Sequence, residues 1–170
     1  ISLKSEDKEM ILRDPATNLQ GYDQLLEFQR SMPYSNISFF DDSTIQANRN
    51  IINKIIENDP SNAEALTTRA MLNFIYQNAG VGFDFGEISI NKLGEDSEKA
   101  LTIDPNNPLA MGFLTFSDVQ KVYWAREKTE RVLIFRKAEK RVNELSKRYP
   151  DHYMTLLARG AYHLSKLYFK

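Results

Sequence analysis

Apolar residues recur at intervals of three or four along most of the chain, and strict alternation of apolar and polar residues is nearly absent. This spacing is typical of amphipathic helices and argues against a sheet. Residues 131–148 show it most clearly, in an apolar stripe made of Phe135, Ala138, Val142 and Leu145. The pattern predicts an all-α fold with seven helices and a short eighth helix near residues 4–12.

Prolines interrupt this pattern at a regular interval of 45 residues, at Pro15, Pro60, Pro105 and Pro150. Proline disfavours the α conformation of the residue before it, so we expect a helix to end before each one. Polar residues follow, and Asn62 and Asn107 suit the N-cap of the next helix. A fixed period is the signature of a helical solenoid. We therefore interpret residues 1–170 as one domain, an array of antiparallel helix pairs.

The positions 6, 10 and 14 residues after Pro60, Pro105 and Pro150 carry a large, a small and a large residue on one helix face. A small residue in the middle lets a neighbouring helix approach closely, so we expect this stripe to be buried. Its members are Leu66, Ala70 and Phe74, then Met111, Thr115 and Val119, then Leu156, Gly160 and Leu164.

The run IDPNN ends one predicted helix, and the helix after it has a small residue ten positions beyond the proline. In this feature the segment from Ala100 to Thr115 resembles the tetratricopeptide (TPR) repeat. The resemblance implies a TPR-like solenoid with right-handed superhelical stacking. TPR repeats have about 34 residues, whereas the period here is 45, and only part of the TPR pattern is present. We expect the additional residues to lie between the two helices of each unit.

A narrower resemblance covers residues 18–76 and rests on Tyr22, Leu26, Asp59, Pro60, Ala63 and Ala65. This segment is similar to the C-terminal region of CadC-type membrane-bound transcription regulators and of TPR-tailed bacterial adenylate cyclases. The resemblance implies that the chain is excised from a longer protein, with an effector domain and any membrane span before Ile1. The absence of cysteine is compatible with either the bacterial cytoplasm or the periplasm.

In TPR arrays, the first helix of each pair lines a concave groove. By this resemblance the candidate groove residues here are Thr67, Met71, Phe74, Gly112, Phe116, Val119, Leu157, Ala161 and Leu164. Nearly all of them are apolar, which leaves two alternatives. Either the chain's own N-terminal helix or connectors fill the groove, or it is an open slot for an amphipathic helix of a partner. Soluble chains rarely expose such a patch, which favours the first alternative.

The connector at residues 78–89 carries a second candidate surface. Its apolar residues Val81, Phe83 and Phe85 stand among glycines. Those glycines do not have the spacing of a phosphate-binding loop that follows a strand. We expect a helix connector, with the alternative that these three residues form a contact loop for a partner.

Charge and composition narrow the class of function. A net charge of -1 gives no sign of direct nucleic-acid binding. No apolar run reaches the roughly 18 residues that membrane insertion needs. Residues 126–148 hold nine basic and four acidic side chains, and residues 84–104 hold six acidic and two basic. We expect helices of opposite charge to attract across the stack. A basic patch for an acidic peptide is the alternative.

Residues for catalysis are sparse. The only histidines, His152 and His163, are separated along one predicted helix by about 16 Å, too far to share a metal ion. We therefore expect no enzyme activity, no cofactor and no metal site. The sequence favours a protein–protein interaction module with a protein or peptide partner, and it leaves self-association open. A sensory domain for a small ligand is the alternative.

Overall fold

The computed structural model describes residues 19–31, 42–79 and 87–168, and these residues form seven helices and no strand. The helices are α2 (Leu19–Ser31), α3 (Asp42–Asn58), α4 (Ala63–Ala79), α5 (Glu87–Ile103), α6 (Pro108–Trp124), α7 (Lys128–Arg148) and α8 (Tyr153–Tyr168). The predicted all-α class is confirmed. The short helix expected near residues 4–12 lies outside the described residues, as do Val81, Phe83 and Phe85.

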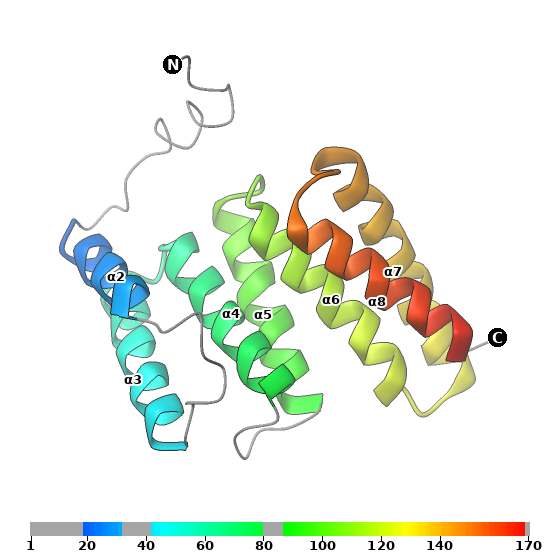
Figure 1. The fold of residues 1–170 in the computed structure, drawn as a ribbon, viewed down its shortest axis with the longest axis horizontal. Helices are drawn as coiled ribbons and strands as arrows, with labels where there is room; N and C mark the ends of the chain where they lie inside the picture. Colours follow the sequence, from blue (N-terminus) through cyan, green and yellow to red (C-terminus); the bar gives the residue numbers. More distant parts are fainter. Residues whose placement is uncertain (1–18, 32–41, 80–86, 169–170) are drawn as a thin grey trace.

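The proline turns end and start helices as the sequence predicts. The side-chain oxygen of Asn62 accepts a hydrogen bond from the backbone of Ala65 at 2.9 Å, and that of Asn107 accepts one from Ala110 at 3.0 Å. Each asparagine thus caps the first turn of the helix that follows it. The turns after α3, α5 and α7 all lie at the upper end of the molecule in Figure 1.

Neighbouring units are also hydrogen-bonded to each other near these turns. The side-chain nitrogen of Asn107 donates to the Thr67 hydroxyl at 3.3 Å. The Tyr149 hydroxyl donates to the carbonyl oxygen of Asn106 at 2.6 Å. These bonds join residues 40 and 43 positions apart, so the segments around successive proline turns contact each other.

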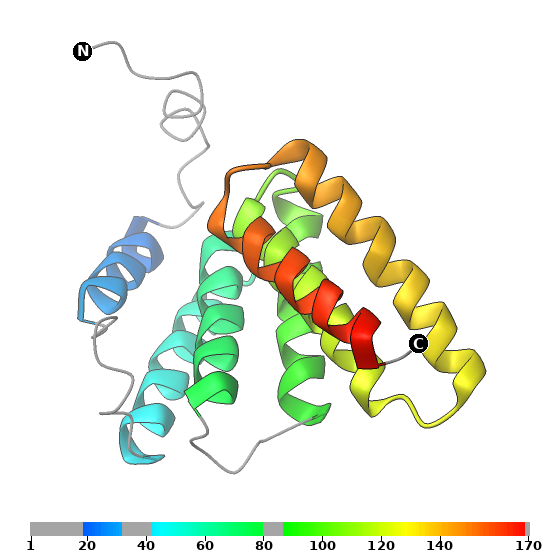
Figure 2. The same ribbon diagram turned by 45° about the vertical axis from the view of Figure 1, so that its right-hand side comes forward.

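Each helix from α2 to α8 packs against the next one in the chain, and α4 and α5 pack most extensively. In addition, α6 contacts both α4 and α8. Figure 2 shows α8 alongside α6 and α7 at one end of the molecule. Helix α8 is therefore the last described layer, with neighbours on one side only.

The extra length of the repeat does not lie where it was expected in the last unit. Only residues 125–127 separate α6 from α7, whereas α7 itself has 21 residues. The expectation of a long connector in every unit is therefore wrong. In this unit the additional residues lengthen a helix.

The predicted stripe is buried in the middle of the molecule. Leu66, Ala70, Thr115 and Val119 are buried, and Ala70 packs in one cluster with Leu93 and Phe113. In α8, however, Leu156 and Leu164 are 58% and 56% exposed. The prediction of burial is wrong for this helix, because no further described helix covers its outer face.

Ion pairs connect the charged helices. Arg141 of α7 lies 3.4 Å from Glu98 of α5 and 3.1 Å from the buried Asp118 of α6. The expected attraction between the basic and the acidic segment is therefore confirmed at this contact. Among the described residues, no helix has the length and apolar character needed to span a bilayer.

Candidate functional site

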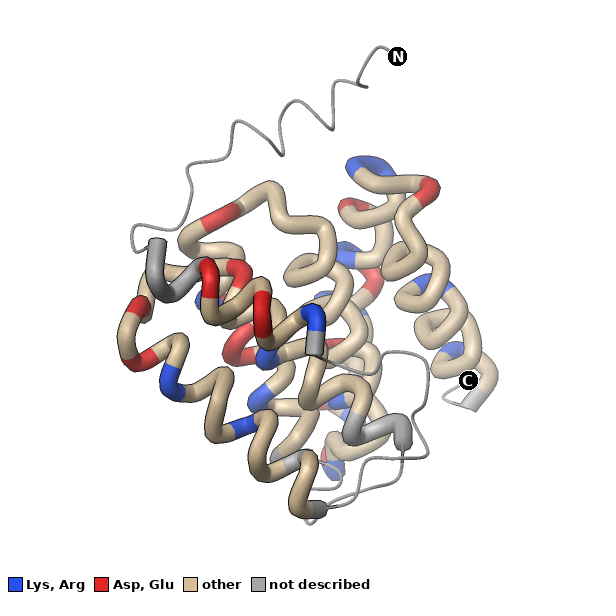
Figure 3. Tube along the Cα trace, turned by 60° about the vertical axis from the view of Figure 1, so that its left-hand side comes forward, with Lys and Arg blue, Asp and Glu red and all other residues tan. Residues whose placement is uncertain are grey.

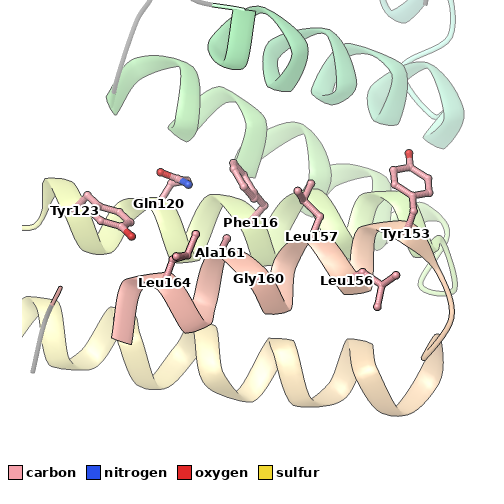
Figure 4. A pocket seen from close by; sticks show the side chains of 9 residues that line it. All are labelled: Phe116, Gln120, Tyr123, Tyr153, Leu156, Leu157, Gly160, Ala161 and Leu164. Carbon is pink, nitrogen blue, oxygen red and sulfur yellow. The ribbon is translucent and has the colours of Figure 1, made fainter. Parts of the chain in front are cut away.

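An open groove lies between α6 and α8, with a volume of about 630 Å³. Its lining is mostly apolar, and Figure 4 shows that the side chains come from these two helices alone. The lining residues are Phe116, Gln120, Tyr123, Tyr153, Leu156, Leu157, Gly160, Ala161 and Leu164.

Close contact at one end of the groove fixes the positions of its two walls. A Cβ atom on Gly112 of α6 would lie only 2.5 Å from the Cβ of Met154 in α8. Because atoms cannot approach so closely, glycine at this position lets the two helices touch. The small residue is thus required by the packing that sets the width of the groove.

Aromatic packing holds the groove's α6 wall in place from behind. Phe116 meets the ring of Phe74 in α4 edge to face, with the ring centroids 4.9 Å apart. Phe74 also contacts Phe113, at 5.4 Å between centroids. Edge-to-face pairs of this kind are favourable and restrict the ring orientation. Phe116 therefore belongs both to the core and to the groove surface.

The predicted groove residues divide into two groups. Phe116, Leu157, Ala161 and Leu164 line the open groove. The others are core: Thr67, Gly112 and Val119 are buried, and Met71 and Phe74 are half-buried in hydrophobic clusters. The first group faces an open groove, whereas the second group is packed among neighbouring described helices.

Thr67 illustrates why the second group of predicted groove residues belongs to the core. Its hydroxyl donates to the carbonyl oxygen of Ala63 at 2.7 Å and accepts from Asn107. Both polar functions are used within the fold, so this side chain does not face a ligand. Val119 likewise packs in a cluster with Ala138, Val142 and Tyr162.

The sequence interpretation missed five groove residues: Gln120, Tyr123, Tyr153, Leu156 and Gly160. Leu156 and Gly160 were assigned to a buried stripe instead. A signal was present in the sequence, because spacings of four, three, four and three residues connect Tyr153, Leu157, Gly160, Leu164 and Leu167. Such spacing is the pattern of a helix that packs along another helix.

These apolar residues of α8, together with Leu156, form a continuous exposed face that we call the α8 stripe. Tyr153 is 58% exposed, Leu157 38%, Leu164 56% and Leu167 70%. Leu156 points away from Leu157 in Figure 4, and Leu167 does not line the groove, so the stripe extends beyond the groove wall. Contiguous exposed apolar surface of this kind usually marks an interaction site.

The charges near the stripe are positive. Helix α8 contains Arg159 and Lys166 and no acidic residue, as the blue positions near the C-terminus in Figure 3 show. Lys166 lies 3.4 Å from Glu139 of α7. Its contacts with Tyr162 and Glu139 raise the pKa of Lys166, so it stays charged. Arg159 is exposed.

The two histidines lie at different places on α8. The ring nitrogen of His152 accepts a hydrogen bond from the Met154 backbone at 3.3 Å at the start of α8. Partial burial lowers the pKa of His152. His163 is exposed on α8. Within the described ranges, no cluster of His, Asp and Glu is suited to hold a metal ion.

Comparisons with protein-family models, curated proteins and solved structures found no significant match to this chain. The geometry of the groove and of the α8 stripe is therefore the basis for the function proposed below.

Proposed function

We propose that this domain is a non-catalytic protein–protein interaction module, and that a partner docks along the groove and the α8 stripe. The observation that carries the proposal is the set of exposed, contiguous apolar side chains on α8. Burying them against a partner would gain hydrophobic free energy that the isolated chain does not obtain.

The TPR-like organisation is part of the same proposal. It is supported by proline turns at a 45-residue interval, by caps at Asn62 and Asn107, and by hydrogen bonds between successive units. In this assignment α6 and α8 are the first helices of their pairs, the helices that line the binding groove in TPR arrays. By resemblance, the module would be the C-terminal region of a larger bacterial signalling or transcription-regulatory protein.

The proposal predicts that charge placed in the groove abolishes partner binding without unfolding the domain. Leu157→Glu combined with Leu164→Glu introduces two carboxylates at exposed positions, so the melting temperature should change little. Leu133→Glu is the matched control, because Leu133 is 62% exposed on α7 and does not line the groove.

The measurement is affinity purification of tagged domains from cells of the source organism. A specific partner should be recovered with wild type and Leu133→Glu, and lost with the double variant. Recovery of the same proteins by all three domains would contradict the proposal.

A small-ligand sensory domain is a second candidate, favoured by the size and edges of the groove. Its volume of about 630 Å³ is in the range of small-molecule pockets. Gln120, Tyr123 and Tyr153 supply polar groups at its margin. A metabolite that raises the melting temperature of wild type, but not of Ala161→Trp, would support this candidate. A flat thermal-shift screen with folded protein would dismiss it.

A further inference from the structure

We infer that the partner element bound by the α8 stripe is an amphipathic α-helix with acidic residues along one edge, which crosses α8 at Gly160. This inference rests on the proposed function and specifies the chemistry of the partner at the same surface.

The face of α8 that carries the stripe is the one that earlier helices use to pack against other helices. At the equivalent positions, Leu66 of α4 packs with Ala100 of α5 and Ala110 of α6. Val119 of α6 packs with residues of α7 and α8. In both cases the residues that cover this face come from the next two helices. The shape of the exposed face in α8 therefore suits a helix.

Gly160 marks the point of closest approach. A Cβ atom added there would meet nothing within 4 Å, whereas one on Gly112 would lie 2.5 Å from Met154 and one on Gly94 2.7 Å from Ser117. Glycine within a helix is less stable than alanine, and no described contact requires it at position 160. Because Gly160 has no side chain, a partner helix that crosses α8 here could bring its backbone close to that of α8.

The length of the stripe sets the length of the partner helix. Its residues from Tyr153 to Leu167 follow the alternating spacing of four and three that forms a helix–helix seam. At 1.5 Å per residue this seam is about 21 Å long. A partner helix of about four turns would cover it.

Charge decides between an unrelated partner and a second copy of the chain. Arg159 is exposed beside the stripe, and α8 offers no acidic residue to pair with it. A second α8 would bring the same positive edge to the interface, whereas glutamates on a different helix would complement it.

Two designed 18-residue helical peptides test this inference with the full 170-residue chain. Both carry leucine at the seam positions, but one has glutamate and the other lysine beside the seam. Fluorescence anisotropy at low salt should show at least tenfold tighter binding of the glutamate peptide to wild type. Arg159→Glu should narrow or reverse this preference.

Gly160→Leu is the steric variant. It should weaken binding of the glutamate peptide at least tenfold with no loss of melting temperature, because the site is open in the folded chain. Leu133→Glu should bind both peptides as wild type does.

Each other outcome overturns the inference in a defined way. Equal affinity for the two peptides would contradict the acidic edge of the partner helix. Unchanged peptide affinity of Gly160→Leu would contradict the crossing point at Gly160. A concentration-dependent dimer in analytical ultracentrifugation, abolished by Gly160→Leu, would show that a second copy occupies the stripe. If neither peptide binds but the groove variants still lose a cellular partner, the partner is not such a helix and the proposed function stands.

Discussion

At the residue scale, three helices carry a small side chain ten positions after a proline, and its surroundings differ along the chain. Ala70 is fully buried among Leu93, Phe113 and their neighbours. Thr115 is fully buried, and its hydroxyl donates a hydrogen bond to the carbonyl oxygen of Met111 at 2.7 Å. Gly160 has open space where its Cβ would be. The small residue is therefore needed for packing within the fold in α4 and α6, whereas no described contact needs it in α8.

This contrast predicts opposite effects of enlarging the two end members of the series. Ala70→Leu should overpack the contact between helices and reduce the free energy of unfolding by about 1–3 kcal/mol. Gly160→Ala should increase it by up to about 1 kcal/mol, because alanine is the better helix former and nothing obstructs it. Urea denaturation of both variants is the measurement. An unchanged midpoint for Ala70→Leu would show that the contact around it is not tightly packed.

At the element scale, a buried carboxylate connects three helices. Asp118 of α6 is 1% exposed and lies within 3.4 Å of Lys137 and 3.1 Å of Arg141, both from α7. Arg141 also reaches Glu98 of α5. A buried charge is stable only when it is paired, so this cluster holds α7 in one register against the helices beneath it.

Removing both partners of the Asp118–Arg141 pair should therefore cost less than the sum of the two single changes. Asp118→Asn should lower the free energy of unfolding by about 1–3 kcal/mol, since it removes the charge that pairs with Arg141. Adding Arg141→Met to that variant should cost little more, because Arg141 has by then already lost its contact with Asp118. Chemical denaturation of the four proteins of this cycle measures the coupling. Strict additivity of the two changes would contradict the role of the pair.

Much of the element structure follows from local sequence. The proline turns, the caps at Asn62 and Asn107 and the helical periodicity each act over a few residues, so the ends of α3, α5 and α7 before the prolines were predicted. The attraction between the acidic and the basic segment could also be predicted from the sequence. The pairing of Asp118 with α7 could not, because it depends on how α6 and α7 lie side by side.

At the scale of the whole molecule, the neighbours of a helix decide whether its apolar face is buried. The residues 6, 10 and 14 positions after a proline have the same spacing in α4 and α8, yet in α4 they pack in the core and in α8 Leu156 and Leu164 face solvent. Periodicity shows which face of a helix is apolar, but it cannot show whether another helix covers that face. For this reason the sequence identified Leu157 and Leu164 as groove residues but could not separate them from the buried Thr67 and Val119.

Site-specific photo-cross-linking in cells of the source organism tests the central claim most directly. A photoreactive phenylalanine analogue at position 157 or 164 should form a covalent adduct with a partner protein, because both positions lie in the groove. The same analogue at position 133, an exposed site on α7, should form none. Adducts at position 133 alone, or none at 157 and 164 in folded protein, would contradict the assignment of the groove and the α8 stripe as the interaction site.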